Sequence, residues 1–191
     1  MSRFPQTDFL LSVAAPEQFP ADVGAEVAFA GRSNAGKSSA INAVLERKAL
    51  VRTSKTPGQT RLLNYFGIAP ERRIVDLPGY GYAAVPPAER RRWLPLVDAL
   101  HERASFRGLF LIVDARRGVR EEDLALIEWA HPERRRVHVL LSKADKLTQA
   151  ERAAALQAAR TELGEGVTAQ LFSAHSRLGV SEAQEVLAAL L

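Results

Sequence analysis

Residues Gly31-Arg32-Ser33-Asn34-Ala35-Gly36-Lys37-Ser38 match the pattern G-x-x-x-x-G-K-[ST] at every required position. The apolar stretch Val27 to Ala30 precedes them, and apolar residues at helical spacing follow from Ser38 to Leu50. A strand, a glycine loop and a helix are the context that a phosphate-binding loop requires, because backbone N–H groups and the helix N-terminus then face one phosphate. A chance glycine loop is the alternative, and the flanking strand and helix disfavour it.

The rest of the chain alternates strand and helix patterns. The expected strands are Leu62 to Ile68, Arg73 to Leu77, Leu109 to Asp114, Val137 to Leu141 and Thr168 to Phe172, and the expected helices are Pro86 to Arg103, Glu121 to Ala130, Gln149 to Leu163 and Val180 to Leu191. This order predicts an α/β P-loop NTPase fold of the Ras-like kind, with helices on both faces of a mainly parallel six-stranded sheet. The short turn after Ile68 makes Leu62 to Ile68 an antiparallel edge strand.

Length and composition set outer limits on the protein. The 191 residues fit one compact domain, which we expect at 26–191 with an N-terminal extension over 1–25 that includes a strand near Phe9 to Ala15. No apolar run is long enough for a membrane helix, and the lack of cysteine agrees with a reducing cytoplasm. The net charge is +4, with arginines clustered at 90–92, 116–120 and 134–136. These clusters predict either a polyanionic partner or solvated helix ends.

Four residues form the expected phosphate and magnesium site. Lys37 is expected to bridge the β- and γ-phosphates, and the Ser38 hydroxyl is expected to bind Mg²⁺. Asp76 ends an apolar strand and is followed by Leu77-Pro78-Gly79. This arrangement places a carboxylate near Mg²⁺, through a water, and the Gly79 N–H near the γ-phosphate. Lys37 and Gly79 are therefore expected to stabilise the γ-phosphate during hydrolysis. The sequence assigns no residue as the catalytic base.

A polar loop, Thr53 to Thr60, lies between these two motifs and contains a Pro-Gly turn. One of its threonines is expected to reach Mg²⁺ when the γ-phosphate is present. The physical chemistry alone does not choose among Thr53, Thr56 and Thr60.

Two later loops follow strands and have the residues needed to bind a purine base. Asp145, in Ser142-Lys143-Ala144-Asp145, can accept hydrogen bonds from N1–H and the 2-amino group of guanine, whereas adenine offers neither. The Lys143 stem can cover the face of the base, and the Ala174 N–H, in Ser173-Ala174-His175, can meet the guanine O6. Ser142 stands where GTPases at large carry Asn, and its side chain is shorter. The alternative for the first loop is a polar turn that caps the next helix.

Taken together, these motifs resemble the EngB (YihA/YsxC) family of the TrmE-Era-EngA-like class of GTPases. The resemblance covers nearly the whole chain and is most specific in Asp76-Leu77-Pro78-Gly79-Tyr80-Gly81-Tyr82-Ala83. It implies a bacterial cytoplasmic GTPase that assembles the large (50S) ribosomal subunit and is linked to cell division and septation. It also implies Thr60 as the switch threonine on Mg²⁺, and we expect a monomer that binds no membrane. The implied GTP contacts are Gly31, Arg32, Ser33, Asn34, Ala35, Gly36, Lys37, Ser38, Gly58, Gln59, Thr60, Arg61, Leu62, Asp76, Leu77, Pro78, Gly79, Ser142, Lys143, Ala144, Asp145, Phe172, Ser173 and Ala174.

Slow intrinsic hydrolysis is predicted, because Tyr80 stands where many GTPases place a Gln that orients water. Asn34 occupies a position that helps bind K⁺ in related GTPases, so K⁺ is a second candidate cofactor beside Mg²⁺. Two other functions use some of the same motifs. A P-loop ATPase or nucleotide kinase is disfavoured by Asp145, and an RNA-binding module with a vestigial pocket is disfavoured by the intact Lys37, Ser38 and Asp76.

Overall fold

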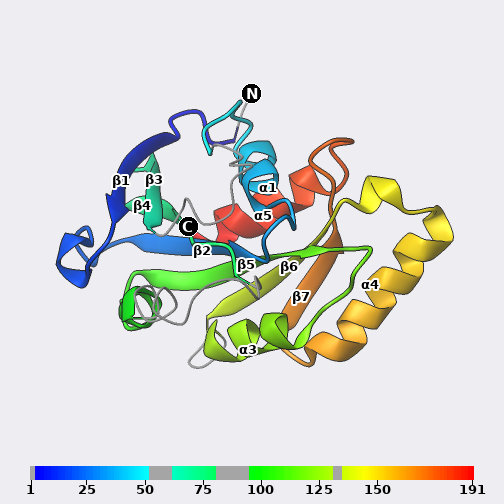
Figure 1. The fold of residues 1–191 in the computed structure, drawn as a ribbon. Coiled ribbons are helices and arrows are strands. Elements are labelled where there is room, and N and C mark those ends of the chain that lie inside the picture. Colours follow the sequence, from blue (N-terminus) through cyan, green and yellow to red (C-terminus); the bar gives the residue numbers. More distant parts are fainter. Residues whose placement is uncertain (1–2, 52–61, 81–94, 131–134) are drawn as a thin grey trace.

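A computed structural model describes residues 3–51, 62–80, 95–130 and 135–191 (Figure 1). The strands are β1 (Asp8–Val13), β2 (Ala25–Gly31), β3 (Leu63–Ala69), β4 (Arg72–Asp76), β5 (Phe106–Asp114), β6 (Arg136–Ser142) and β7 (Val167–Leu171). The helices are α1 (Lys37–Val44), α3 (Glu121–Ala130), α4 (Gln149–Leu163) and α5 (Val180–Leu190), with short 3-10 turns at Pro16–Gln18 and Ala144–Lys146. Residues 95–101 are also helical and form the described part of the helix expected from Pro86 to Arg103.

The strands form one mixed sheet in the order β1-β3-β4-β2-β5-β6-β7. Strands β4, β2, β5, β6 and β7 are parallel, as alternating strands and helices require. The α/β fold predicted from the sequence is therefore confirmed. None of the helices in the described residues is long and apolar enough to cross a membrane.

The prediction that Leu62 to Ile68 form the edge strand is wrong. Strand β1 pairs antiparallel with β3, from Asp8 opposite Gly67 to Val13 opposite Leu63, so the sheet has seven strands and β3 lies inside it. The pairing is irregular between Phe9 and Leu11, which allows the Leu10 side chain to lie against Gly67. The antiparallel edge strand is β1, because β3 offers its outer backbone groups to the N-terminal segment.

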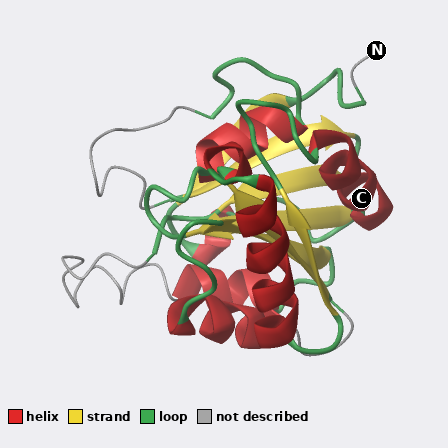
Figure 2. Ribbon diagram, turned by 90° about the vertical axis from the view of Figure 1, so that its right-hand side faces the viewer, coloured by secondary structure: helices red, strands yellow, loops and turns green. Residues whose placement is uncertain are grey.

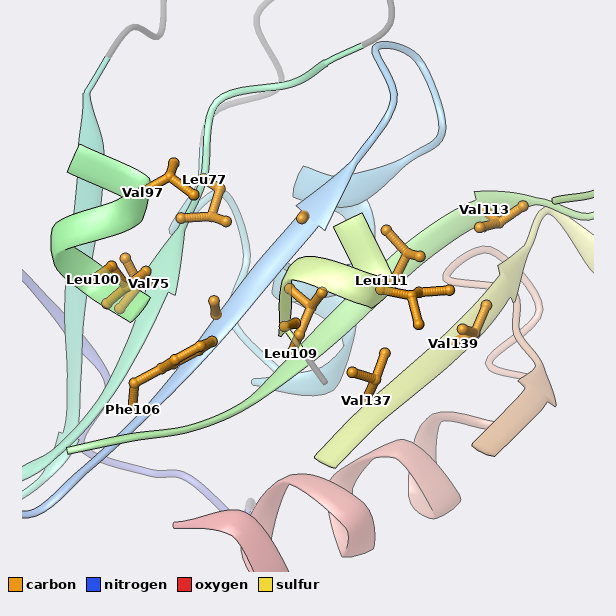
Figure 3. Packing of buried hydrophobic residues seen from close by; sticks show 14 of the residues in the cluster. Val75, Leu77, Val97, Leu100, Phe106, Leu109, Leu111, Val113, Val137 and Val139 are labelled. Atoms are coloured by element: carbon orange, nitrogen blue, oxygen red, sulfur yellow. The ribbon is translucent and has the colours of Figure 1, made fainter. Parts of the chain in front are cut away.

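Alternate residues of the central strands pack on opposite faces of the sheet. Phe29 of β2 and Phe110 of β5 face the layer that contains α1 and α5, and their rings stack at 4.9 Å. Leu109 and Leu111 face the other layer, formed by residues 95–101, α3 and α4, where Figure 3 shows them among Val97, Leu100, Val137 and Val139. Figure 2 shows helices on both sides of the strands. This double coverage explains why the central strands carry apolar residues on both faces.

The first helix is shorter than its sequence pattern predicts. Helix α1 ends at Val44, not at Leu50. Glu46 and Ala49 have positive φ values of 53° and 58°, which a helix cannot contain. The Asn42 side chain also binds the backbone N–H and carbonyl of Val51, at 2.9 and 2.8 Å, and so folds the chain back across the helix end.

Candidate functional site

The candidate site residues follow the carboxyl ends of neighbouring parallel strands. The glycine loop leaves β2, Asp76 ends β4, Ser142 ends β6, and Phe172 follows β7. In an open α/β sheet, the loops after these strand ends form the ligand crevice. The fold therefore brings segments more than 100 residues apart in the sequence to the end of the sheet at which the parallel strands have their carboxyl ends (Figure 1).

The glycine loop from Gly31 to Ser38 has a backbone that requires both of its motif glycines. A Cβ on Gly31 would lie 2.9 Å from the Ile112 carbonyl oxygen of the adjacent strand β5, which is too close for any side chain. Gly36 has φ of 96° and directly precedes Lys37, the first residue of α1. The loop thus leads the backbone N–H groups to the N-terminus of α1, where they can bind an anion.

Lys37 and Asp76 form a buried ion pair at the start of α1 and the end of β4. The Lys37 ammonium donates a hydrogen bond to the Asp76 carboxylate, which is only 3% exposed. Burial raises the pKa of the Asp76 carboxyl, and the Lys37 ammonium opposes that rise. The two groups expected to serve phosphate and Mg²⁺ therefore lie in direct contact.

Gly79 and Tyr80 lie directly beside the glycine loop. A Cβ on Gly79 would be 3.7 Å from the Ser33 backbone nitrogen, and Ser33 N–H donates to the Tyr80 carbonyl at 2.9 Å. The Tyr80 hydroxyl donates to the buried Asp123 carboxylate of α3. Burial raises the pKa of Tyr80, and the neighbouring Asp123 charge raises it further. Tyr80 is thus neutral, and its hydroxyl is directed to α3.

Ser142 and Lys143 attach the first base-site loop to the glycine loop. The Ser142 hydroxyl donates to the Ala35 carbonyl at 2.5 Å and lies 3.1 Å from the Val113 carbonyl, so this side chain does reach the loop although it is shorter than Asn. The Lys143 ammonium donates to the Asn34 carbonyl. The Lys143 stem passes over Gly36, with Cε 3.7 Å from the position of a Gly36 Cβ.

Asp145 and Ser173 connect the two base-site loops. The Ser173 hydroxyl, fully buried, donates to Asp145 Oδ1 at 2.6 Å, and Lys146 lies 3.4 Å from Oδ2. The Ser173 bond and the Lys146 charge lower the pKa of Asp145, so the carboxylate is an acceptor at neutral pH. The Ala144 N–H donates to the Phe172 carbonyl at 3.1 Å and brings the same two loops together.

A cleft of about 280 Å³ opens between these loops and the glycine loop. This volume lies just below the usual range of roughly 300–1,000 Å³ for small-molecule sites. Its lining residues are Gly36, Ser39, Ser142, Lys143, Asp145, Lys146, Phe172, Ser173, Ala174 and His175. One concave surface thus joins a candidate phosphate loop to a carboxylate that can pair with a base.

The structure places most, though not all, of the site residues expected from the sequence. Arg32 lies 3.5 Å from Glu122 of α3, and Leu62 directly precedes β3. Gly58, Gln59, Thr60 and Arg61 lie outside the described residues. So do Thr53, Thr56, Gly81, Tyr82, Ala83, Arg134 and the arginines at 90–92.

The donor atoms present suit Mg²⁺ better than a transition metal. The Ser38 hydroxyl in the first turn of α1 and the Asp76 carboxylate are hard oxygen ligands, and Mg²⁺ keeps several waters and substrate phosphate oxygens beside such groups. Within the described residues, no group of three or more His, Cys, Asp or Glu side chains could hold a metal by itself. A magnesium ion bound together with a nucleotide fits this donor set.

Two buried carboxylates at the site were not predicted. Asp114 ends β5 and contacts Lys143, while Asp123 of α3 contacts Tyr80. Neither belongs to a recognisable motif. For Asp114 one signal was available, because it ends an apolar strand in the same way as Asp76 does.

Fold and site together define a P-loop GTP-binding protein, and comparisons with known proteins support this class. The family model described as "50S ribosome-binding GTPase" matches residues 26–143. The "Probable GTP-binding protein EngB" of Coxiella burnetii (strain CbuG_Q212) is 46% identical over 188 residues, which cover 96% of this chain and 92% of that one. The chain belongs to the EngB family of GTP-binding proteins.

Two solved structures show the same fold at lower sequence identity. A crystal structure of a probable GTP-binding protein engB has a TM-score of 0.64 and 22% identity, and covers 87% of this chain and 98% of that one. A crystal structure of Era in complex with MgGDPNP and nucleotides 1506–1542 of 16S ribosomal RNA has a TM-score of 0.66 and 24% identity. It covers 87% of this chain and 56% of the Era chain.

Proposed function

We propose that this protein is a slow, Mg²⁺-dependent GTPase switch that acts in the assembly of the large ribosomal subunit in the cytoplasm, with a link to cell division and septation. The observation that carries the GTP part is the cleft in which Gly36, Ser142 and Asp145 share one surface. A phosphate-binding loop alone would bind ATP as readily as GTP. A carboxylate held by Ser173 at the far end of the same cleft favours guanine.

In this proposal the glycine-loop N–H groups bind the β-phosphate, and Lys37 binds the β- and γ-phosphates. Lys37 then exchanges its bond to Asp76 for phosphate oxygens, and the freed Asp76 carboxylate is available for a water of the metal. Ser38 and Thr60 would hold Mg²⁺, which neutralises charge on the transferred phosphate. The Gly79 N–H meets the γ-phosphate, since Gly79 lies beside the Ser33 backbone.

Slow hydrolysis is supported by the contacts of Tyr80. Its hydroxyl is bound to Asp123, and a neutral phenol directed to α3 does not orient a water as a Gln amide does. We include K⁺, bound near Asn34, as a source of additional positive charge. Single-turnover rates in K⁺ and Na⁺ buffers test this part. Rates that differ between the two ions in the wild type but not in Asn34→Ala are the expected result, and equal wild-type rates would remove K⁺ from the proposal.

The ribosomal part rests on the family description and on charge. The "50S ribosome-binding GTPase" model covers most of the chain. Arg32, Arg117 and Arg120 line a small hollow beside the glycine loop together with Asp114 and Asp123, so positive charges outnumber negative ones there. Arginines at such a surface can bind RNA phosphates, and salt weakens that binding.

Cosedimentation with purified large subunits tests the switch. We expect a monomer that binds more tightly with a GTP analogue than with GDP, because the γ-phosphate orders Thr60 and the 79–83 loop together. Replacing Arg90, Arg91 and Arg92 with Ala should weaken binding and flatten its salt dependence. Replacing the exposed Arg72, Arg107 and Arg160 removes equal charge elsewhere and serves as the control. Equal binding in both nucleotide states would refute the switch.

The alternatives predict different results. A nucleotide kinase or ATPase would bind ATP at least as well as GTP. An RNA-binding module with a vestigial pocket would bind neither nucleotide and would associate with RNA in their absence. A nucleotide-binding assay therefore separates all three.

A further inference from the structure

Asp114, the last residue of β5, lies between two cationic side chains. Arg116 donates to it through Nε at 2.9 Å and through its terminal nitrogen at 2.7 Å, in a two-pronged arrangement. The Lys143 ammonium donates to Asp114 Oδ2 at 3.0 Å. The Asp114 carboxylate is only 5% exposed, whereas the Arg116 and Lys143 side chains are 44% and 32% exposed, so it is the carboxylate that is shielded from water.

The same Lys143 ammonium also donates to the Asn34 carbonyl of the glycine loop. Asn34 has φ of 64°, a left-handed conformation that Asn adopts more readily than most other residues but less readily than glycine. The bond from Lys143 helps to hold the loop in this shape. The bonds run from Arg116 to Asp114, from Asp114 to Lys143, and from Lys143 to the loop that carries the phosphate N–H groups.

We propose that Asp114 is a positioning residue for nucleotide binding, which holds the Lys143 ammonium against the Asn34 carbonyl and so keeps the glycine loop in its phosphate-binding shape. This inference rests on the proposed function, because it concerns the same nucleotide site. Asp114 itself lines the hollow on the far side of the loop and not the cleft of the base. It acts through Lys143 and not by touching the nucleotide.

The geometry separates this role from base selection. Asp145 is held by Ser173 and Lys146, and its bonds do not involve Asp114. Loss of Asp114 should therefore reduce the affinities for GTP and GDP by the same factor and leave the preference for guanine unchanged. Burial raises the pKa of Asp114, but Arg116 and Lys143 outweigh this and hold it well below the usual range. The contribution of Asp114 to nucleotide affinity should therefore be constant from pH 5 to 9.

The test compares Asp114→Asn with the wild type by the dissociation rates of fluorescent GDP and GTP analogues. Asn keeps the shape and removes the charge, so we expect both nucleotides to leave about 10-fold faster, with the GTP preference over ATP retained. Asp22→Asn is the matched control. Asp22 accepts three hydrogen bonds, from Ala104 and Ser105, at the opposite end of the sheet, so its loss lowers stability without changing dissociation.

Lys143→Met distinguishes positioning from a general loss of structure. If Asp114 acts through the ammonium, adding Asp114→Asn to Lys143→Met will not speed dissociation further. Additive effects of the two substitutions, or wild-type dissociation rates in folded Asp114→Asn, would overturn the proposal. If Asp114→Asn does not fold, Arg116→Gln replaces it in the same cycle and should speed release by a smaller factor. Failure of the wild type itself to bind GTP would instead refute the proposed function.

Discussion

Buried charges gather at both ends of the parallel strands, and the two groups differ in what they contact. At the amino end, Glu26 of β2 is fully buried and accepts hydrogen bonds from Arg73, Arg103 and Tyr65. The two arginines also donate to backbone carbonyls of residues 20–23. Every charge there is satisfied by the protein and holds the N-terminal segment on the sheet.

At the carboxyl end the charges contact a glycine loop. Lys37 belongs to that loop and Lys143 donates to its Asn34 carbonyl, close to the backbone N–H groups at the start of α1. Lys37 can exchange its bond to Asp76 for phosphate, whereas the arginines of the amino end are surrounded by their acceptors. The comparison indicates that a buried ion pair marks a binding site only where a ligand can replace one of the two paired side chains.

The largest expected effect is at the amino end. Glu26→Ala leaves two buried guanidinium groups without their carboxylate, and should reduce the free energy of unfolding by about 3–5 kcal/mol. Urea denaturation measures this loss. At a temperature where the variant is folded, its GTP affinity should lie within about 2-fold of the wild type. A large loss of affinity in the folded variant would mean that the two ends are not independent.

Lys37→Ala should reduce nucleotide affinity strongly and stability only a little, the reverse of Glu26→Ala. Its affinity for GTP and GDP should fall ~100-fold, because charge-assisted bonds to phosphate are worth roughly 1.5–3 kcal/mol each. Titration calorimetry measures the affinity. The free energy of unfolding should change by less than it does in Glu26→Ala, since Asp76 becomes protonated more readily once its cation is removed. Lys48→Ala, a lysine outside the motifs, is the control.

A smaller effect is expected from pH at the amino end. Hydrogen bonds from Ser105 and Ala104 outweigh partial burial and lower the pKa of Asp22 from 3.8 to about 2. Because the folded-state value is the lower one, Asp22 stabilises the fold above pH 4, and this contribution is lost as the pH falls from about 4 to 2. For this partly exposed group we expect about 1 kcal/mol.

Urea midpoints of the wild type and Asp22→Asn should therefore converge between pH 5 and pH 2. A difference that stays constant over this range would contradict the assignment. GTP binding at neutral pH should be the same in both proteins.

Much of the fold could be predicted from periodicity. Helices α3 and α4 begin and end where the pattern places them, because each has polar residues at its start and apolar residues at helical spacing along its length. The end of α1 could not be predicted, since apolar residues continue to Leu50 while the Asn42 side chain redirects the chain. The place of β1 beside β3 depends on a long-range pairing that no local pattern encodes.

The candidate site was predictable where a motif fixes both residue type and spacing. The glycine loop, Asp76 and Asp145 lie at the same end of the sheet, because each ends or follows a parallel strand, and their contacts with GTP stay a prediction. Asp114 offered only its place at the end of an apolar strand and Asp123 offered no signal, because their contacts with Lys143 and Tyr80 join residues that are distant in the sequence. The supporting contacts of a site are therefore harder to predict than the groups they support.

Asp145 offers the most direct test of the account, since it is expected to choose the base. Competition of GTP, ATP and xanthosine triphosphate against a fluorescent guanine nucleotide should be measured for the wild type and Asp145→Asn. We expect the wild type to prefer GTP, and the variant to lose GTP affinity ~100-fold and favour xanthosine triphosphate, whose C2 oxygen accepts from the amide. An unchanged preference for GTP in Asp145→Asn, or equal wild-type affinity for ATP and GTP, would contradict the account.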